Sequence, residues 1–397
     1  MYDYLVIGGG IIGLNIAREL KEKFQDAKVA VIEKEEDVAM HSSGRNSGVL
    51  HAGFYYSSDS LKAKFTRVGN ARLHKFCEER NLRINKCAKV VVATDETELE
   101  GLEELKRRGD INGVSLEWLS EEELNKKFPL IKTYKKALFS PTTATIDPKE
   151  VTLEFKKYIQ ELGVKVLTNT AYLKKISKNE ISTTQGNIRY GKLINCAGLY
   201  ADKIAKDFGY AKNYVIIPFK GIYLKDKYNK CGLETNVYPV PNLANPFLGV
   251  HYTFTVENAS KIGPTAIPAF WRENYKGFDN FRFDEMCQIL FYEAKLFITN
   301  AFGFRSLAIE EVKKYFKSHL LGLAKNLTKP LDMSGFNSWS TPGIRAQLLD
   351  IKTLELVQDF VVEGDETTIH ILNAVSPAFT SSMPFSKWVV ENFVEKK

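Results

Sequence analysis

The feature that most constrains the fold is a glycine-rich turn between an expected strand and an expected helix, Gly8-Gly9-Gly10-Ile11-Ile12-Gly13. Residues 2–7 predict a buried strand, residues 12–24 carry apolar side chains at a helical spacing of four, and residues 28–33 predict the next strand. A strand, a helix and a strand in direct succession form a right-handed βαβ unit on a parallel sheet. The chain is therefore predicted to contain an α/β domain.

The spacing of the glycines is that of a dinucleotide site. The first glycine permits a tight turn, the second lets the backbone approach a pyrophosphate, and the third lets the helix pack closely on the strand. The N-terminus of the helix directs backbone N–H groups and the positive end of its dipole toward the phosphates. The residues predicted to hold the phosphates are Gly8, Gly10, Ile11, Ile12 and Gly13.

An acid, Glu33, ends the second expected strand and is followed by Lys34. A carboxylate at this place accepts hydrogen bonds from ribose hydroxyls and disfavours a 2′-phosphate, which argues against NADP. FAD and NAD both fit these residues. Two small, polar stretches from opposite ends of the chain, 41–53 and 373–382, favour a longer ligand with contacts beyond its ADP half, and hence FAD. Two ordinary surface loops are the alternative.

Composition excludes several other classes of protein. The chain has 397 residues, 44% hydrophobic and 26% charged, which is typical of a globular protein of about two domains. The net charge of +7 is spread along the chain, so no nucleic-acid partner is predicted. Five cysteines without a CxxC pair indicate neither a disulfide framework nor a metal site. No run of 18 apolar residues is present, and we expect a cytoplasmic protein.

The remaining pattern predicts helices over 59–81, 96–108 and 150–162, and a helix start after the Ser120 capping signal. From 212 to 340 many aromatic residues and prolines predict an inserted, mostly antiparallel sheet with a helical section near 283–325. The predicted domains are a cofactor domain of residues 1–80, 148–210 and 340–397, and a substrate domain of residues 81–147 and 211–339.

Apolar side chains recur at spacings of three and four in the first part of that helical section. They are Phe283, Met286, Leu290, Ala294, Phe297, Ala301 and Phe304. We expect this stripe to be the buried face of a helix. A face that docks on a membrane or a partner is the alternative.

Several segments resemble the L-2-hydroxyglutarate oxidase/dehydrogenase family of the D-amino-acid-oxidase-like flavoprotein superfamily. They follow the family's order over nearly the whole chain and cover residues 46–56, 60–65, 238–241, 247–253, 263–266, 343–347 and 373–378. The resemblance implies a Rossmann-like domain that binds FAD without a covalent bond. It also implies an antiparallel-sheet (α+β) substrate domain, with the flavin ring at the junction of the two domains.

The resemblance also assigns residues to the cofactor. Ser42, Ser43, Asn46, Ser47 and Gly48 would lie along the ribityl chain and ring, and the main chain of Val166 would face the adenine. The remaining contacts are expected from Gly198, Ser376, Ala378 and Phe379.

Oxidation of a 2-hydroxy acid transfers a hydride from C2 to flavin N5 and removes the hydroxyl proton. It therefore needs a cation for the carboxylate and a base near the hydroxyl. Arg345 is our candidate for the carboxylate, because the resemblance places it where related amino-acid oxidases have their substrate arginine. His51 is the candidate base and His251 the weaker rival. For the second carboxylate of a diacid the chain offers Lys220, Tyr223, Thr253 and Arg272.

The predicted function is oxidation of L-2-hydroxyglutarate to 2-oxoglutarate, with electrons passed to oxygen or a quinone. Oxidation of glycine or another amino acid, or of glycerol 3-phosphate, is the alternative within the superfamily. A tRNA-modifying flavoprotein is disfavoured because lysines alternate with acids, and a redox-silent module because Arg345 and His51 are both present. Peripheral contact of residues 283–304 with the inner face of the cell membrane stays open.

Overall fold

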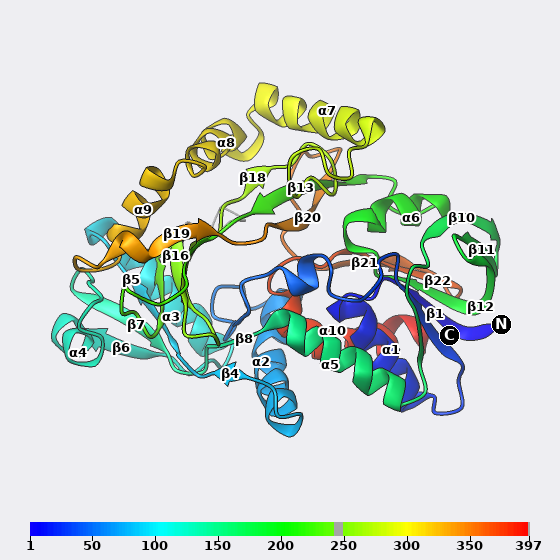
Figure 1. Ribbon diagram of the computed structural model, residues 1–397, viewed down its shortest axis with the longest axis horizontal. Helices are drawn as coiled ribbons and strands as arrows, with labels where there is room; N and C mark the ends of the chain where they lie inside the picture. Colours follow the sequence, from blue (N-terminus) through cyan, green and yellow to red (C-terminus); the bar gives the residue numbers. More distant parts are fainter. Residues whose placement is uncertain (242–248, 396–397) are drawn as a thin grey trace.

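The computed structural model describes residues 1–241 and 249–395. Phe247 and Leu248, which begin one of the family-like segments, lie outside the described residues. Within the described part of the chain, two eight-stranded sheets form the two halves of the molecule, and both ends of the chain lie in the half that holds β1 and β12 (Figure 1).

The first sheet contains the predicted βαβ unit. Its main strand order is β10-β11-β12-β1-β2-β9, and β22 pairs with both β12 and β21. The pairs β1–β12, β1–β2, β2–β9 and β12–β22 are parallel, as predicted. The strands are β1 Tyr2–Ile7, β2 Val29–Ile32, β9 Lys165–Leu167, β10 Tyr172–Ser177, β11 Glu180–Thr183, β12 Gly186–Asn195, β21 Val361–Gly364 and β22 Thr368–Asn373.

The helices in this half of the molecule include α1 Ile11–Lys23, α2 Leu61–Glu79, α5 Pro148–Glu161, α6 Ala201–Asp207 and α10 Ala378–Val389. Of these, α1 and α6 pack on the sheet, α5 and α10 pack on α1, and α2 packs on α10. The apolar spacing predicts one buried stripe on α1, yet the helix is buried over most of its circumference because it lies against α5, α10 and the sheet (Figure 1). The C-terminal helix thereby closes the core around the glycine-rich turn.

The second sheet has the order β19-β14-β17-β16-β15-β5-β7-β6 and is antiparallel except for the pair β5–β15. Its strands are β5 Lys89–Val92, β6 Glu117–Ser120, β7 Lys136–Ser140, β14 Leu224–Asp226, β15 Asn236–Pro239, β16 His251–Phe254, β17 Ser260–Gly263 and β19 Phe336–Trp339. Next to it lie α3 Leu99–Ile111 and α4 Glu121–Lys127. Ser120 begins α4 with the predicted capping box, in which Glu123 returns the hydrogen bond.

A smaller sheet connects the two halves. β13 Tyr214–Gly221 pairs antiparallel with β20 Gly343–Asp350, and β18 Ile267–Pro268 adds to the other edge of β13. A short sheet of β3 Val49–Leu50, β4 Ile84–Asn85 and β8 Ala144–Ile146 lies near α2. The domain boundaries given above stay a prediction.

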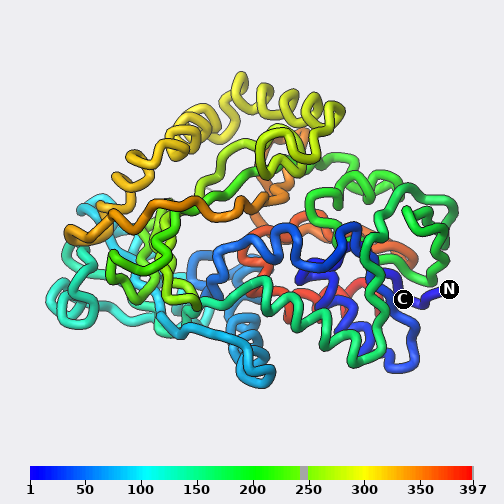
Figure 2. The backbone as a smooth tube through the Cα atoms, in the orientation of Figure 1, coloured from blue at the N-terminus to red at the C-terminus, as the bar shows by residue number. Residues whose placement is uncertain are grey.

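The helical section contains α7 Phe283–Thr299, α8 Phe304–Lys313 and α9 Lys317–Lys325, which run along the outer edge of the molecule (Figure 2). The predicted buried stripe on α7 is wrong, because Phe283, Leu290 and Phe297 are exposed. The residues of α7 that are buried are Glu285, Ile289, Glu293 and Leu296.

The inward face of α7 contains two acids. Glu285 accepts hydrogen bonds from the Lys203 ammonium and the Arg272 backbone N–H, which compensates its burial. Burial raises the pKa of Glu293 to about 8. Of the predicted stripe, Phe304, which begins α8, is buried. Among the described residues, no helix is long and apolar enough to cross a membrane.

Candidate active site

A cavity of about 980 Å³ extends from the glycine-rich turn to β20. This volume is at the upper end of the range of about 300–1,000 Å³ that ligand pockets occupy. Segments from both ends of the chain line it, as predicted for an extended cofactor. The predicted site residues among its lining are Gly8, Gly10, Ile11, Ile12, Glu33, Lys34, Ser42, Ser43, Asn46, Ser47, His51, Gly198, Tyr223, Arg345, Ser376, Ala378 and Phe379.

The turn after β1 has no room for side chains. Gly8 has a φ of +106°, and a Cβ atom there would lie 2.5 Å from the carbonyl oxygen of Cys196. A Cβ on Gly13 would lie 2.0 Å from the carbonyl oxygen of Gly8. By contrast, a Cβ on Gly10 would meet only the Ser43 hydroxyl, at 3.0 Å. These contacts are the structural reasons for glycine at the first and third positions, and they leave the backbone at Gly10 open to the cavity.

The carboxylate of Glu33 is fixed beside this turn. Its Oε2 accepts a hydrogen bond from the Gly9 N–H at 2.8 Å, and its Oε1 accepts one from the Glu35 N–H at 3.0 Å. Each carboxylate oxygen has a second lone-pair site, so both can still accept from a ribose hydroxyl. The arrangement fits the adenosine ribose of FAD.

The polar loop 41–53 uses its side chains to hold its own shape. Ser42 Oγ donates to the Ile344 carbonyl at 2.7 Å, and Ser43 Oγ accepts from the Ile11 N–H at 2.9 Å. Asn46 Nδ2 donates to the carbonyls of Ser42 and Ser43 at 3.1 and 3.0 Å. These side chains therefore connect the loop to α1 and β20. Their contact with a cofactor stays a prediction.

Some predicted site residues lie outside the cavity wall. Gly13 and Gly48 do not line the cavity but pack against neighbouring backbone. A Cβ on Gly48 would lie 2.3 Å from the Ile146 carbonyl oxygen. Val166 pairs with Val31 and lines a separate, shallow depression. Residues 170–173 line the main cavity instead.

Two residues that were predicted to bind the substrate, Lys220 and His251, instead contact other groups of the protein. Lys220 Nζ donates to Asn274 Oδ1 at 3.4 Å. The His251 ring stacks on Tyr238 with centroids 3.7 Å apart, and its Nδ1 lies 2.8 Å from the Gly249 carbonyl oxygen. Burial lowers the pKa of His251 to about 3, so this imidazole is neutral. Neither side chain lines the cavity.

Arg345, Tyr223 and His51 line the same cavity, and the charge of Arg345 acts on Tyr223. Arg345 lies in β20 opposite Phe219 of β13, so a two-stranded ladder fixes its backbone. The main chain of His51 is held on both sides, because its N–H donates to Thr380 Oγ1 at 3.2 Å and its carbonyl accepts from Asn70 Nδ2 at 3.2 Å. The site therefore has one half-buried cation and one rigidly placed imidazole.

The imidazole of His51 is an unprotonated base at neutral pH. Burial is the main cause that lowers its pKa well below 6.5, and the charge of Lys89 and the presence of His251 act in the same direction. Its Nδ1 is buried and has no hydrogen-bond partner among the described residues. Burial also raises the pKa of Tyr223, so its hydroxyl stays protonated and can donate.

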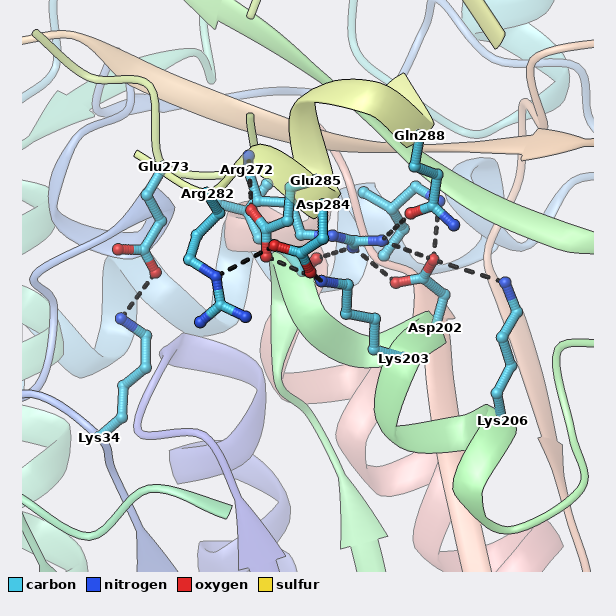
Figure 3. A network of polar contacts seen from close by, with 12 residues as sticks. Lys34, Asp202, Lys203, Lys206, Arg272, Glu273, Arg282, Asp284, Glu285 and Gln288 are labelled. Atoms are coloured by element: carbon cyan, nitrogen blue, oxygen red, sulfur yellow. Dashed lines mark hydrogen bonds and ion pairs between the residues drawn. The ribbon is translucent and has the colours of Figure 1, made fainter. Parts of the chain in front are cut away.

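The sequence pattern missed a charged network at the Glu33 end of the cavity, shown in Figure 3. Lys34 pairs with Glu273 at 2.7 Å and Lys203 with Glu285 at 2.8 Å. Arg272 is fully buried and donates to both carboxylate oxygens of Asp202, at 2.6 and 3.0 Å. These pairs attach residues 272–288 to α6 and to the turn after β2. Arg272 is thus unavailable for a substrate carboxylate.

Comparison with known proteins defines the class. A model of the FAD dependent oxidoreductase family matches residues 3–391, and the chain belongs to this family, with FAD as its cofactor. L-2-hydroxyglutarate dehydrogenase of Escherichia coli strain K12 is 36% identical over 398 residues, which cover 98% of this chain and 92% of the relative. The human mitochondrial L-2-hydroxyglutarate dehydrogenase is 34% identical over 417 residues, covering 100% and 89%. The chain belongs to the L-2-hydroxyglutarate dehydrogenase family, as the residues predicted.

Solved structures show the same fold. L-alpha-glycerophosphate oxidase from Mycoplasma pneumoniae, with FAD bound, matches with a TM-score of 0.76 at 23% identity and covers 100% of this chain and 96% of that one. Glycine oxidase from Geobacillus kaustophilus matches with a TM-score of 0.70 at 18% identity, covering 100% and 95%. The predicted fold class is confirmed.

Substitution of Gly10 by valine tests the cofactor assignment. Because a Cβ there meets only the Ser43 side chain, we expect Gly10→Val to fold but to exclude the pyrophosphate. The purified variant should lack the visible absorbance of flavin while its far-ultraviolet circular dichroism is unchanged. Gly322→Val is the matched control, since a Cβ at Gly322 meets nothing within 4 Å. A Gly10→Val protein with a full complement of flavin would disprove the assignment.

Proposed function

We propose that the chain oxidises the secondary alcohol of L-2-hydroxyglutarate to the ketone of 2-oxoglutarate. The observation that carries this proposal is that Arg345 and His51 line the same cavity as the glycine-rich turn. The names of the E. coli and human relatives support the choice of substrate. When bound, FAD accepts the C2 hydrogen with its electron pair as a hydride.

Arg345 has the geometry to hold the carboxylate next to the reacting carbon. Its guanidinium can donate two parallel hydrogen bonds to one carboxylate, which fixes the orientation of C2 as well as its position. Since β20 pairs with β13 along its whole length, the backbone of Arg345 is held in register. Tyr223 contributes a protonated hydroxyl at the same end of the cavity.

His51 accepts the proton of the C2 hydroxyl. A neutral imidazole is the form that accepts a proton, and the lowered pKa of His51 keeps it neutral. Asn70 and Thr380 hold its backbone from α2 and α10, so the imidazole is fixed relative to both ends of the chain. Removal of this proton accompanies loss of the hydride and leaves a carbonyl group.

The electron acceptor after the flavin is oxygen or a quinone, and we infer a cytoplasmic protein with peripheral contact at the inner face of the cell membrane. The support is a set of exposed apolar side chains in α7, in α8 and in the segments that follow each of these helices. They are Phe283, Leu290, Phe291, Phe297, Ile298, Phe302, Ile309, Val312, Tyr315 and Phe316. Exposed aromatic and aliphatic groups of this number are typical of an interaction surface.

Anaerobic reduction of the bound flavin tests the substrate. We expect L-2-hydroxyglutarate to bleach the flavin of the purified protein and to yield one equivalent of 2-oxoglutarate. Glycine and glycerol 3-phosphate should leave the absorbance unchanged. Bleaching by either of these, without bleaching by L-2-hydroxyglutarate, would contradict the proposed function.

Variants of the two site residues should separate binding from proton transfer. Loss of two charge-assisted hydrogen bonds, about 3 kcal/mol, predicts that Arg345→Met raises KM about 100-fold. Loss of the base predicts that His51→Gln lowers the rate of flavin reduction by roughly 10²- to 10⁴-fold. Both variants should keep bound flavin.

The pH profile adds a second readout for His51. A base with a lowered pKa stays unprotonated at neutral pH, so the wild-type rate should fall only as the pH drops well below 6.5. A His51→Gln protein with the wild-type rate would remove His51 from this role, and an unchanged KM in Arg345→Met would do the same for Arg345.

Sedimentation with vesicles tests the membrane face. Wild-type protein should sediment with vesicles that contain phosphatidylglycerol, while the double variant Phe291→Ser, Ile298→Ser should stay in the supernatant. Ile111→Ser removes an exposed apolar side chain from α3 and serves as the control, with binding equal to wild type. Equal sedimentation of all three proteins would contradict contact through this face.

A further inference from the structure

A second basic side chain, Lys89, is buried in the fold and has no carboxylate partner among the described residues. Lys89 is fully buried in β5, and its Nζ has no hydrogen-bond partner among the described residues. Aromatic rings surround the ammonium: it lies 4.1 Å from the Tyr238 ring centroid, 5.0 Å from that of Tyr55 and 5.7 Å from that of Phe54. Burial of an unpaired ammonium is costly, and rings compensate only part of this cost.

The position of Lys89 connects it to the site. The rings of Phe54 and Tyr55, which lie beside the ammonium, belong to the segment that directly follows His51, a residue of the cavity wall. The charge of Lys89 also contributes to the lowered pKa of His51. Tyr238, over which the ammonium lies, is itself within electrostatic reach of Tyr223, another lining residue. Lys89 does not line the cavity. Its ammonium is separated from solvent by the rings of Phe54, Tyr55 and Tyr238.

A second polar group beside Lys89 is also unsatisfied. The hydroxyl of Tyr55 is buried and has no hydrogen-bond partner among the described residues. The Lys89 ammonium and the Tyr55 hydroxyl thus both lack a hydrogen-bond acceptor among the described residues. Two such donors can bind an anionic group with several lone pairs. A carboxylate is such a group.

The other basic side chains near this end are already engaged. Lys220 donates to Asn274, and Arg272 is paired with Asp202. Burial is the main cause that lowers the pKa of Lys62 to about 8, and the charge of Asp359 partly offsets this effect. No carboxylate contributes to the pKa of Lys89, which burial lowers to about 7.

On the basis of the proposed function, we propose that Lys89 and the Tyr55 hydroxyl form the subsite for the second carboxylate of the substrate. Arg345 then holds the carboxylate next to C2, while Lys89 selects a dicarboxylate over a monocarboxylate 2-hydroxy acid. The flexible four-carbon stem of lysine lets the ammonium turn toward the cavity when an anion enters. The incoming carboxylate supplies the counter-ion that Lys89 lacks.

Lys89→Met tests the subsite, because methionine keeps most of the volume and removes the charge. We expect KM for L-2-hydroxyglutarate to rise roughly 30- to 1,000-fold, while the KM for L-2-hydroxybutyrate, which lacks the second carboxylate, changes less than threefold. The affinity of glutarate, measured by calorimetry, should fall by a similar factor to the KM effect. Tyr55→Phe, which removes only the hydroxyl, should shift the same ratio in the same direction by a smaller factor.

The controls separate this subsite from a general loss of function. Lys62→Met removes another buried lysine and should leave the ratio of the two KM values as in wild type. Thermal unfolding of Lys89→Met should occur at the wild-type temperature or higher, since an unpaired buried charge is lost. A ratio unchanged in both Lys89→Met and Tyr55→Phe would overturn the subsite while the proposed function stands. Wild-type protein that does not oxidise L-2-hydroxyglutarate would overturn the proposed function itself.

Discussion

The close packing of α1 on β1 is the contact on which the rest of the site depends. Gly13 lies against the carbonyl of Gly8, and Gly8 lies against the carbonyl of Cys196 at the end of β12. This packing brings the N-terminus of α1 to the carboxyl ends of three parallel strands, where ligands of open α/β sheets bind. The bond from the Gly9 N–H to Glu33 then fixes the acid of the neighbouring strand at the same edge.

From this edge the cavity continues along segments that are remote in sequence. Ser42 connects the loop after β2 to β20, and Thr380 of the C-terminal helix connects to the backbone of His51. The cofactor end and the substrate end are therefore parts of one hydrogen-bonded framework. Under the proposals above, Arg345 and Lys89 would each bind one carboxylate of a dianion, and His51 would be the neutral base.

The sequence predicted those features of the fold that depend on residues close to one another along the chain. The glycine spacing, Glu33, the parallel βαβ unit and the Ser120 capping box all depend on neighbours within a few dozen residues, and the structure contains each of them. Residues of the polar loop 41–53 line the cavity, and their contact with the cofactor stays a prediction. The loop's serine and asparagine side chains bond to backbone groups, which sequence could not show.

The errors concern features that depend on distant partners. The inward face of α7 contains Glu285 because Lys203, from α6, and the Arg272 backbone bind it, so apolar spacing alone selected the wrong face. Arg272 was a candidate for the substrate, but Asp202 pairs with it. Lys89 lies in an otherwise apolar strand, so the sequence shows no sign of a functional role for it. The structure distinguishes it because its buried Nζ has no hydrogen-bond partner among the described residues.

A crystal structure with FAD and 2-oxoglutarate bound would test the central claim most directly. We predict electron density for the pyrophosphate at Gly8 to Gly13 and for the flavin ring between the two ends of the cavity. The two carboxylates of the ligand should lie on Arg345 and on Lys89. A flavin in another part of the molecule, or a diacid bound away from Arg345 and His51, would contradict the site described above.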